Sequence, residues 1–224
     1  FGRSHGPCVG CILEGVPEGT AIDEAFIAQE MSLRKPKGKI GTPRRETDEV
    51  EIVQGVIGGH ATGQPILMKI ANGDTDGSKF YDTPRPGHAD LPALLKFPKH
   101  DLRGSGQFSG RLTAAIVAAG AVAKLLLSER GIRIGAFTRR VGDVADDESR
   151  GPRDALSSRD YATRACTPEL DERMRLAIEE AGGEGDSIGG IVECIIDGLP
   201  IGFGGIWFEA LDAELAKAVF GIPA

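Results

Sequence analysis

Short apolar runs alternate with polar, glycine-bearing stretches along the whole chain. Apolar runs bounded by Gly and Pro predict strands, whereas apolar residues three and four positions apart predict helices. The expected strands lie in Val9–Gly19, which ends in a Gly-Pro turn, and in Val50–Ile57, Pro65–Ile70, Ile132–Arg140 and Gly190–Ile196. The expected helices cover Ile22–Leu33, Ser109–Ser128, Pro168–Ala181 and Trp207–Val219. The pattern therefore predicts a chain that mixes helices and strands throughout.

The clearest helix is Ser109–Ser128, because it holds no proline, is rich in alanine and is followed by Gly131 as a stop signal. Its small residues predict close packing against a sheet or a neighbouring helix. By contrast, Ala71–Pro92 is polar and rich in Gly, Asp and Pro, which predicts a long loop. Loops of this length are uncommon inside a compact domain and usually carry function.

Two strand-and-turn segments form an internal repeat. Val9–Gly19 reads VGCILEGVPEG and Val192–Gly202 reads VECIIDGLPIG, and the two agree at six of eleven positions. Each copy precedes a helical pattern; the alternative is a chance likeness between two unrelated strand-turn-helix units. The strands that follow the first copy have no counterpart after the second copy, because the sequence ends at Ala224, soon after the helical pattern. We therefore expect a C-terminal part of the protein to be missing from this sequence.

The charge balance and hydropathy argue against two classes of function. Lys and Arg number 26 against 33 Asp and Glu, and the resulting charge of −7 does not favour general nucleic-acid binding. The longest apolar run, Ala114–Ala123, is too short to span a bilayer, so no membrane association is predicted. Glycine accounts for 32 of 224 residues, which allows many backbone N–H groups to approach a ligand closely.

The four cysteines do not predict a metal site. Cys8 and Cys11 form a single CxxC motif, while Cys166 and Cys194 are too far apart in sequence to complete a zinc ribbon. Structural burial is the favoured interpretation, and redox or metal use is the alternative. Few cysteines without a dense pattern fit a reducing cytoplasm.

Two histidines stand in motifs that suit proton transfer. His5 lies in Gly2-Arg-Ser-His-Gly6 at the start of a strand, where a general acid, an anion ligand and a plain surface histidine are all possible. Ser4 and His5 do not predict a hydrolase pair, because adjacent side chains on a strand point to opposite sides. His88 lies in Arg85-Pro-Gly-His-Ala-Asp90, where Pro and Gly fix a turn and the two charged residues flank the imidazole. His60 and His100 are interpreted as surface or structural residues.

Two further segments predict an anion site. Arg103–Arg111 reads RGSGQFSGR and opens the clearest helix, so its backbone N–H groups and the helix N-terminus favour a phosphate. It matches neither a Rossmann fingerprint nor a Walker motif. The second segment is a loop with six cations, which either faces solvent or nucleic acid or captures a small polyanion. Its cations are Arg34, Lys35, Lys37, Lys39, Arg44 and Arg45.

Taken in order along the chain, these motifs resemble the chorismate synthase family. The matching segments are GRSHG, CILEGVPEG, TPRRETDEVEIVQGVIGGHATGQPI, RPGHAD, GSGQFSGRLTAAIVAAGAVAK and GDSIGGIVECIIDGLPIGFG. The resemblance implies an α+β fold, a β-α-β sandwich built around an internal pseudo-repeat. It treats residues 1–224 as one domain that forms the N-terminal two-thirds of the family protein, with an incomplete second repeat from near residue 190.

The resemblance also implies a function. The family reaction is the trans-1,4-elimination of phosphate from 5-enolpyruvylshikimate 3-phosphate, which gives chorismate in the shikimate pathway of aromatic amino acid biosynthesis. A cytoplasmic homotetramer and reduced FMN are implied. Two acids, one near the departing phosphate and one near the flavin ring, map to His5 and His88. The flavin segment maps to Gln107, Phe108 and Ser109, and the substrate-binding cations map to Arg34, Lys39, Arg44, Arg45 and Arg111.

This chain departs from the family pattern at three places. Arg3 stands where the family usually has an acid, and Gln107 and Leu112 replace an Arg and a Glu of the flavin segment. The family's C-terminal third, with further flavin-contacting residues and a catalytic Asp, is absent. These departures support an alternative, a catalytically impaired paralogue that binds flavin or phosphorylated ligands. A third hypothesis is a flavin reductase or other oxidoreductase that uses a nicotinamide cofactor such as NADP.

Overall fold

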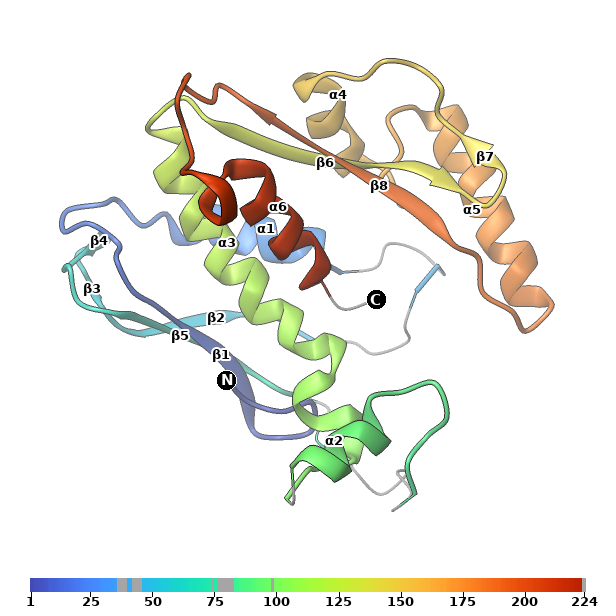
Figure 1. The fold of residues 1–224 in the computed structure, drawn as a ribbon, viewed down its shortest axis with the longest axis horizontal. Coiled ribbons are helices and arrows are strands. Elements are labelled where there is room, and N and C mark those ends of the chain that lie inside the picture. Colours follow the sequence, from blue (N-terminus) through green and yellow to red (C-terminus); the bar gives the residue numbers. More distant parts are fainter. Residues whose placement is uncertain (36–39, 42–45, 74, 76–82, 98, 223–224) are drawn as a thin grey trace. The chain divides into compact units, whose positions relative to one another are not determined.

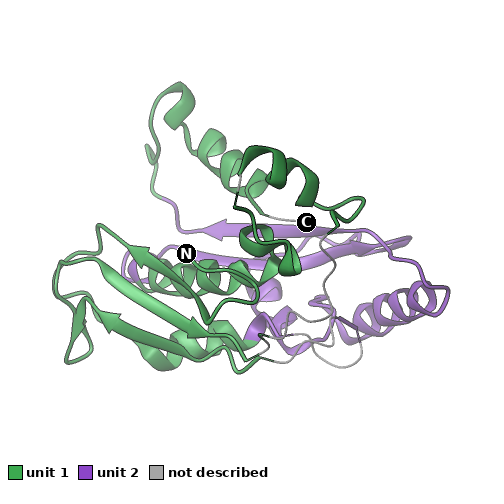
Figure 2. Ribbon diagram, turned by 90° about the horizontal axis from the view of Figure 1, so that it is seen from below, with its two compact units in different colours: residues 1–32, 44–125, 200–224 green, residues 33–43, 126–199 purple. Residues whose placement is uncertain are grey.

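The computed structural model describes residues 1–35, 40–41, 46–73, 75, 83–97 and 99–222, and Figure 1 shows the order of its elements. The chain divides into two compact units, coloured separately in Figure 2. Unit 1 contains residues 1–32, 44–125 and 200–224, and unit 2 contains residues 33–43 and 126–199. The prediction of one domain over residues 1–224 stays a prediction, and the units are described separately below.

Unit 1 contains a three-stranded antiparallel sheet. Strand β5 (Ile66–Ala71) lies in the middle, with β1 (Cys8–Leu13) on one side and β2 (Val50–Gln54) on the other. Buried residues alternate along β5 at Ile66, Met68 and Ile70, so the strand turns one apolar face to the core. A small hairpin of β3 (Val56–Ile57) and β4 (His60–Ala61) follows β2.

The helices of unit 1 bury small and aliphatic side chains. Helix α1 (Glu24–Leu33) buries Ile27 and Met31, and helix α3 (Thr113–Ser128), which continues into unit 2, buries a stripe of alanines. An ion pair between Lys124 and Glu30 joins α3 to α1. Residues 103–128 are apolar enough to resemble a membrane span, but α3 itself has 16 residues, fewer than the ~20 that a crossing needs. The remaining helices, α2 and α6, are Asp90–Lys96 and Leu211–Phe220.

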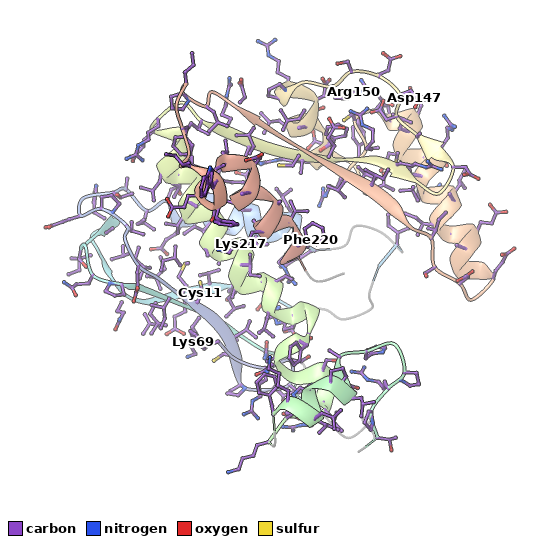
Figure 3. The ribbon with its side chains drawn as sticks, in the orientation of Figure 1. Cys11, Lys69, Asp147, Arg150, Lys217 and Phe220 are labelled. Carbon is purple, nitrogen blue, oxygen red and sulfur yellow. The ribbon has the colours of Figure 1, made fainter. Side chains whose placement is uncertain are left out.

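Unit 2 is built on a long antiparallel pair, β6 (Arg133–Val141) and β8 (Gly190–Asp197), with short β7 (Val144–Ala145) beside β6. Helices α4 (Pro152–Ser157) and α5 (Pro168–Gly183) contribute to two apolar clusters on this sheet. Arg150, labelled in Figure 3, donates to the buried carboxylate of Asp146 at 2.8 Å and lowers its pKa. Unit 2 is thus held by its own core and its own ion pair.

The structure supports the internal repeat at the level of backbone conformation. Gly15 and Gly198 are equivalent in the two sequences and have φ of 78° and 80°. Gly19 and Gly202, the next equivalent pair, have φ of 82° and 83°. Each turn follows an antiparallel strand, β1 or β8, and precedes a helix, α1 or α6. Both copies therefore require glycine for the same left-handed turns.

Most elements were predicted correctly, and three predictions were wrong in part. The helix predicted for Trp207–Val219 begins at Leu211, after a 3-10 segment at Trp207–Glu209. The clearest helix begins at Thr113 instead of Ser109, because two 3-10 segments, Arg103–Phe108 and Gly110–Leu112, precede it. The predicted loop Ala71–Pro92 ends earlier than expected, because α2 begins at Asp90. The α+β class is confirmed by the elements that the structure describes. The sandwich arrangement stays a prediction.

Candidate active site

His5 lies in a tight turn before β1 and is half-buried. The Ser4 amide donates to the Gly106 carbonyl at 3.1 Å, which fixes this turn to the glycine-rich loop. A Cβ added to Gly104 would lie 2.7 Å from both His5 Cε1 and Ser4 Oγ. The ring and the hydroxyl therefore approach the same glycine. Our expectation that they point to opposite sides was wrong, because the segment is a turn and not a strand.

His88 lies on the exposed side of the turn before α2. Gly87 has φ of 71°, so the predicted Pro-Gly turn is confirmed. The His88 ring Nδ1 is 3.0 Å from the Pro86 carbonyl oxygen. Because a carbonyl only accepts, Nδ1 is the protonated nitrogen in this hydrogen bond, which leaves Nε2 to exchange a proton with a ligand.

The charged residues of the RPGHAD motif contact each other and not His88. Arg85 Nε donates to Asp90 Oδ2 at 2.8 Å, and its second nitrogen donates to Oδ1 at 3.2 Å. Asp90 is 1% exposed, and the Arg85 guanidinium holds the pKa of this carboxyl well below its usual range. The pair closes the base of the turn that carries His88.

The glycine-rich loop connects these two histidine-bearing turns. Gly104, Ser105 and Gly106 have φ of 55°, 61° and 53°, an unbroken left-handed run. Ser105 Oγ donates to Asp90 at 3.0 Å and accepts from Arg85 at 2.6 Å, while Gly104 packs against His5. One three-residue run thus fixes both turns. We predicted this loop as an opening helix turn that binds an anion; its backbone forms a compact bridge, and the anion-binding role stays a prediction.

A hollow of about 460 Å³ lies beside the loop. Its lining is cationic and partly aromatic, and it includes Gln107 from the predicted flavin segment. The Phe108 ring packs 6.2 Å from Phe97 and 5.7 Å from His100, measured between centroids. Asp101, whose pKa is lowered mainly by hydrogen bonds from Arg103, lies at its edge. The lining residues are Arg3, Phe97, Lys99, His100, Asp101 and Gln107.

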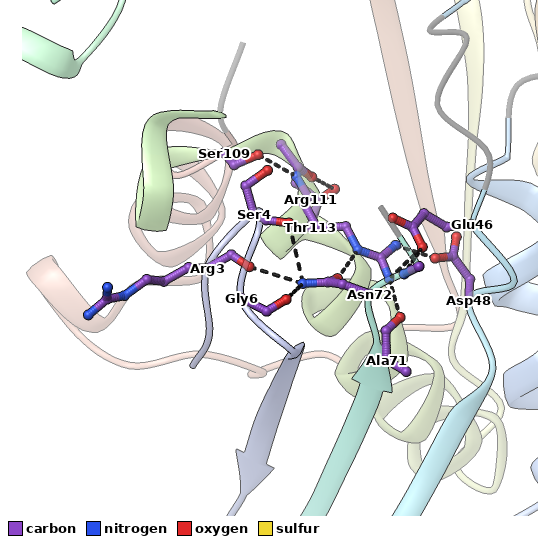
Figure 4. A network of polar contacts seen from close by, with 12 residues as sticks. Arg3, Ser4, Gly6, Glu46, Asp48, Ala71, Asn72, Ser109, Arg111 and Thr113 are labelled. Carbon is purple, nitrogen blue, oxygen red and sulfur yellow. Dashed lines mark hydrogen bonds and ion pairs between the residues drawn. The ribbon is translucent and has the colours of Figure 1, made fainter. Parts of the chain in front are cut away.

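Arg111 is buried within a polar network, drawn in Figure 4. Its guanidinium contacts Asp48, donates to the Ala71 carbonyl at 3.0 Å and donates through Nε to Asn72 Oδ1 at 2.7 Å. A second acid, Glu46, lies 4.0 Å away. Arg111 was predicted as a substrate ligand, and this role stays a prediction.

The remaining predicted site residues are four cations and Ser109. Arg34 lies in unit 2, half-buried, and is described apart from the site in unit 1. Lys39, Arg44 and Arg45 lie outside the described residues. Ser109 caps the turn that follows it, since its hydroxyl accepts from the Arg111 amide at 3.2 Å.

Sequence reasoning missed the residues that support this site. Asn72 and Asp48 gave no motif, and Phe97, Lys99 and Asp101 stand between two motifs that drew more notice. His100 was interpreted as surface or structural, yet it lines the hollow. A signal was available, because LKFPKHDLR mixes aromatic and basic residues directly before the glycine-rich loop.

Comparisons with known proteins cover the whole chain. The family model for chorismate synthase matches residues 1–224. The chain is 47% identical to the chorismate synthase of Aeropyrum pernix and 43% identical to that of Thermococcus kodakarensis, in each case over all of this chain and over 60% and 63% of the relative. A crystal structure of chorismate synthase superposes with a TM-score of 0.82 at 33% identity, covering all of this chain and 65% of the other. The chain thus spans less than two-thirds of the relatives that it matches.

Proposed function

Because the chain belongs to the chorismate synthase family, we propose that its full-length gene product catalyses the trans-1,4-elimination of phosphate from 5-enolpyruvylshikimate 3-phosphate. In this reaction a C–O bond to phosphate and a C–H bond break, and a new carbon–carbon double bond forms. The products are chorismate and inorganic phosphate, which together account for the hydrogen lost from carbon, with no net redox change. The reaction would make the protein a lyase of the shikimate pathway.

The observation that carries the proposal is the bridge formed by Gly104–Ser105–Gly106. It packs against His5 through Gly104 and holds the His88 turn through the contacts of Ser105 with Arg85 and Asp90. Two imidazoles that lie in separate motifs are therefore fixed to one rigid loop. A rigid support of this kind suits two acids that must act on different parts of one substrate.

We assign His5 to the departing phosphate and His88 to the flavin ring, as the family resemblance implies. His88 suits proton exchange because it is exposed, its Nδ1 is engaged by the Pro86 carbonyl, and its Nε2 carries the exchangeable site. The half-buried position of His5 suits an acid that meets a substrate group in a partly dehydrated setting.

The hollow beside Gln107 fits part of a flavin mononucleotide. Phe97, which packs against Phe108, offers an apolar ring face, and Arg3 and Lys99 offer cations for a phosphate. Gln107, Phe108 and Ser109 are the residues that we propose against the cofactor. When bound, reduced FMN supplies transient electron density that assists cleavage of the C–O bond.

The proposed substrate set comprises the cations of the basic loop, and the family resemblance implies Arg111 as a further member. The substrate carries a phosphate and carboxylates, which favour guanidinium groups as bidentate partners. For Arg111 the contacts support a role behind the site, since they point to Asp48, Asn72 and the Ala71 carbonyl. The basic-loop residues are Arg34, Lys39, Arg44 and Arg45.

The assembly and setting proposed for the protein follow from the family. We propose a homotetramer in the cytoplasm, and the four free cysteines are in keeping with a reducing compartment. The alternative is an impaired paralogue that binds flavin or phosphorylated ligands, for which Arg3, Gln107 and Leu112 are the relevant departures.

The test is an anaerobic assay of the full-length gene product with 5-enolpyruvylshikimate 3-phosphate, with and without reduced FMN. Chorismate and phosphate should form together, only with reduced flavin. His88→Ala should abolish turnover and leave substrate affinity within about tenfold, because the side chain is exposed and its hydrogen bond is a local one to the Pro86 carbonyl.

His60→Ala is a matched control. His60 is also exposed, and its Nδ1 is likewise 3.0 Å from the carbonyl two residues earlier, that of Gly58. This variant should keep full turnover. Flavin binding without turnover by the unmodified protein would favour the impaired paralogue, and equal loss in both histidine variants would refute the role of His88.

A further inference from the structure

The backbone on both sides of His5 is hydrogen-bonded to one residue, Asn72. Its side-chain Nδ2 donates to the carbonyls of Arg3, Ser4 and Gly6 at 3.1, 3.3 and 2.8 Å. Its backbone N–H donates to the Pro7 carbonyl at 3.1 Å. The backbone carbonyls of the two residues before His5 and of the two residues after it therefore all accept hydrogen bonds from Asn72. Figure 4 draws those of Arg3, Ser4 and Gly6.

The orientation of the Asn72 amide is fixed by its partners. Arg111 Nε can only donate, and it meets Oδ1 at 2.7 Å. Three carbonyls, which can only accept, surround the opposite nitrogen. A flipped amide would place donor against donor and acceptor against acceptor, so this network permits one arrangement.

Burial gives this arrangement its rigidity. Asn72 is 9% exposed and Ser4 is 1% exposed, so water has little access to replace the bonds between them. Asn72 follows directly on β5, the central strand of the unit 1 sheet. The turn that carries His5 is thus fixed to the most restrained element of the unit.

We propose that Asn72 is the positioning residue for His5 and that Arg111, by holding the amide oxygen of Asn72, is the second member of the same device. This inference rests on the proposed function, in which His5 is an acid. Neither residue needs to touch the substrate for this role. Arg111 and the two acids beside it, Asp48 and Glu46, then serve to orient the His5 imidazole through Asn72.

The decisive variant is Asn72→Asp in the full-length protein. The carboxylate keeps an oxygen for Arg111 but removes both N–H donors and sets an acceptor against three carbonyls. We expect kcat to fall by about 10- to 100-fold with KM within about threefold, since small displacements of a catalytic group have effects of this order. In a His5→Ala background the same change should alter kcat by less than about twofold.

Lys69→Ala is the control. Lys69, labelled in Figure 3, lies three residues earlier on β5, its side chain is 44% exposed, and it forms an ion pair with the exposed Glu51. It should leave kcat and KM unchanged. Full additivity of Asn72→Asp with His5→Ala would overturn the proposal, as would a raised KM with unchanged kcat, which would indicate substrate binding through Arg111.

A spectroscopic measurement separates this inference from the proposed function. If His5→Ala is fully active, the proposed role of His5 as an acid is refuted. The NMR resonances of the His5 imidazole, compared between the unmodified protein and Asn72→Asp, then test whether Asn72 positions the ring. A shift of these resonances in Asn72→Asp supports it, and identical resonances overturn it. If Asn72→Asp does not fold, the unmodified protein labelled with ¹⁵N-asparagine decides: slow exchange of the Asn72 side-chain protons supports the proposal, and fast exchange overturns it.

Discussion

Replacing Arg111 by Met tests whether this residue supports the structure or holds the substrate. The Arg111 side chain is 2% exposed, and the carboxylates beside it, Asp48 and Glu46, are 2% and 6% exposed. Met retains much of the volume and removes the charge. The change leaves two acids buried without their shared cation, and it breaks the hydrogen bonds to Asn72 and to the Ala71 carbonyl.

Breaking a buried ion pair by removing one partner costs about 3–5 kcal/mol, mostly because the remaining charge is desolvated without compensation. We therefore expect urea unfolding of the full-length Arg111→Met protein to show a loss of about that size. Replacing Asp48 as well, in Arg111→Met with Asp48→Asn, should recover part of the loss, because the buried charge is removed together with its partner.

Arg103→Met is the matched control for this experiment. Arg103 also binds a carboxylate through two nitrogens, at 2.9 and 2.8 Å to Asp101, but its side chain is 49% exposed. Solvent screens that pair, so the unfolding midpoint should stay within experimental error. If Arg111→Met unfolds like the unmodified protein and raises KM steeply, Arg111 is a substrate ligand and the structural argument is refuted.

Two further predictions concern the bridge and the turn that it holds. The Arg85 guanidinium lowers the pKa of Asp90, so ionised Asp90 stabilises the fold fully above about pH 4, and this contribution is lost as the pH falls through the lowered pKa. In urea unfolding, the free energy of unfolding of Asp90→Asn should therefore fall less steeply below pH 4 than that of the unmodified protein. Gly104→Ala places a Cβ 2.7 Å from His5 Cε1 at a left-handed φ, and should lower both kcat and stability, the latter by about 1–2 kcal/mol. Gly15→Ala, at φ of 78° with no atom within 4 Å of the added Cβ, should lower stability alone, and equal kcat in the two variants would refute the contact with His5.

The strands and helices could be predicted because their signals are local. The short apolar run in Ile66–Ala71 predicts a strand. The proline-free, alanine-rich sequence of α3 predicts a helix that packs closely. The repeat was visible for the same reason, since Gly15 and Gly198 recur where the backbone needs a left-handed turn. The start of α3 was misplaced because Ser109 looks like a helix residue, whereas its hydroxyl caps a 3-10 turn.

The supporting residues of the site could not be predicted, because their contacts join segments far apart in sequence. Asn72 is the only asparagine in the chain, and it meets residues 66 to 69 positions earlier. Asp48 and Arg111 are 63 positions apart. The glycine-rich motif and the family resemblance suggested that Arg111 faces a ligand, and only the fold shows that two acids lie beside it.

The residues that line the hollow change how the departures from the family pattern are interpreted. Gln107 replaces an arginine, which by itself removes a cation from the flavin segment. Yet Arg3, itself a departure, and Lys99 both line the same hollow as Gln107. The hollow therefore presents two cations besides Gln107, and the carboxylate of Asp101, which also lines it, is bonded to Arg103 and lies 3.7 Å from Arg3. A hollow that presents these cations can attract a phosphorylated planar ligand, which both the proposed enzyme and the impaired paralogue would bind, so turnover and not flavin binding distinguishes the two.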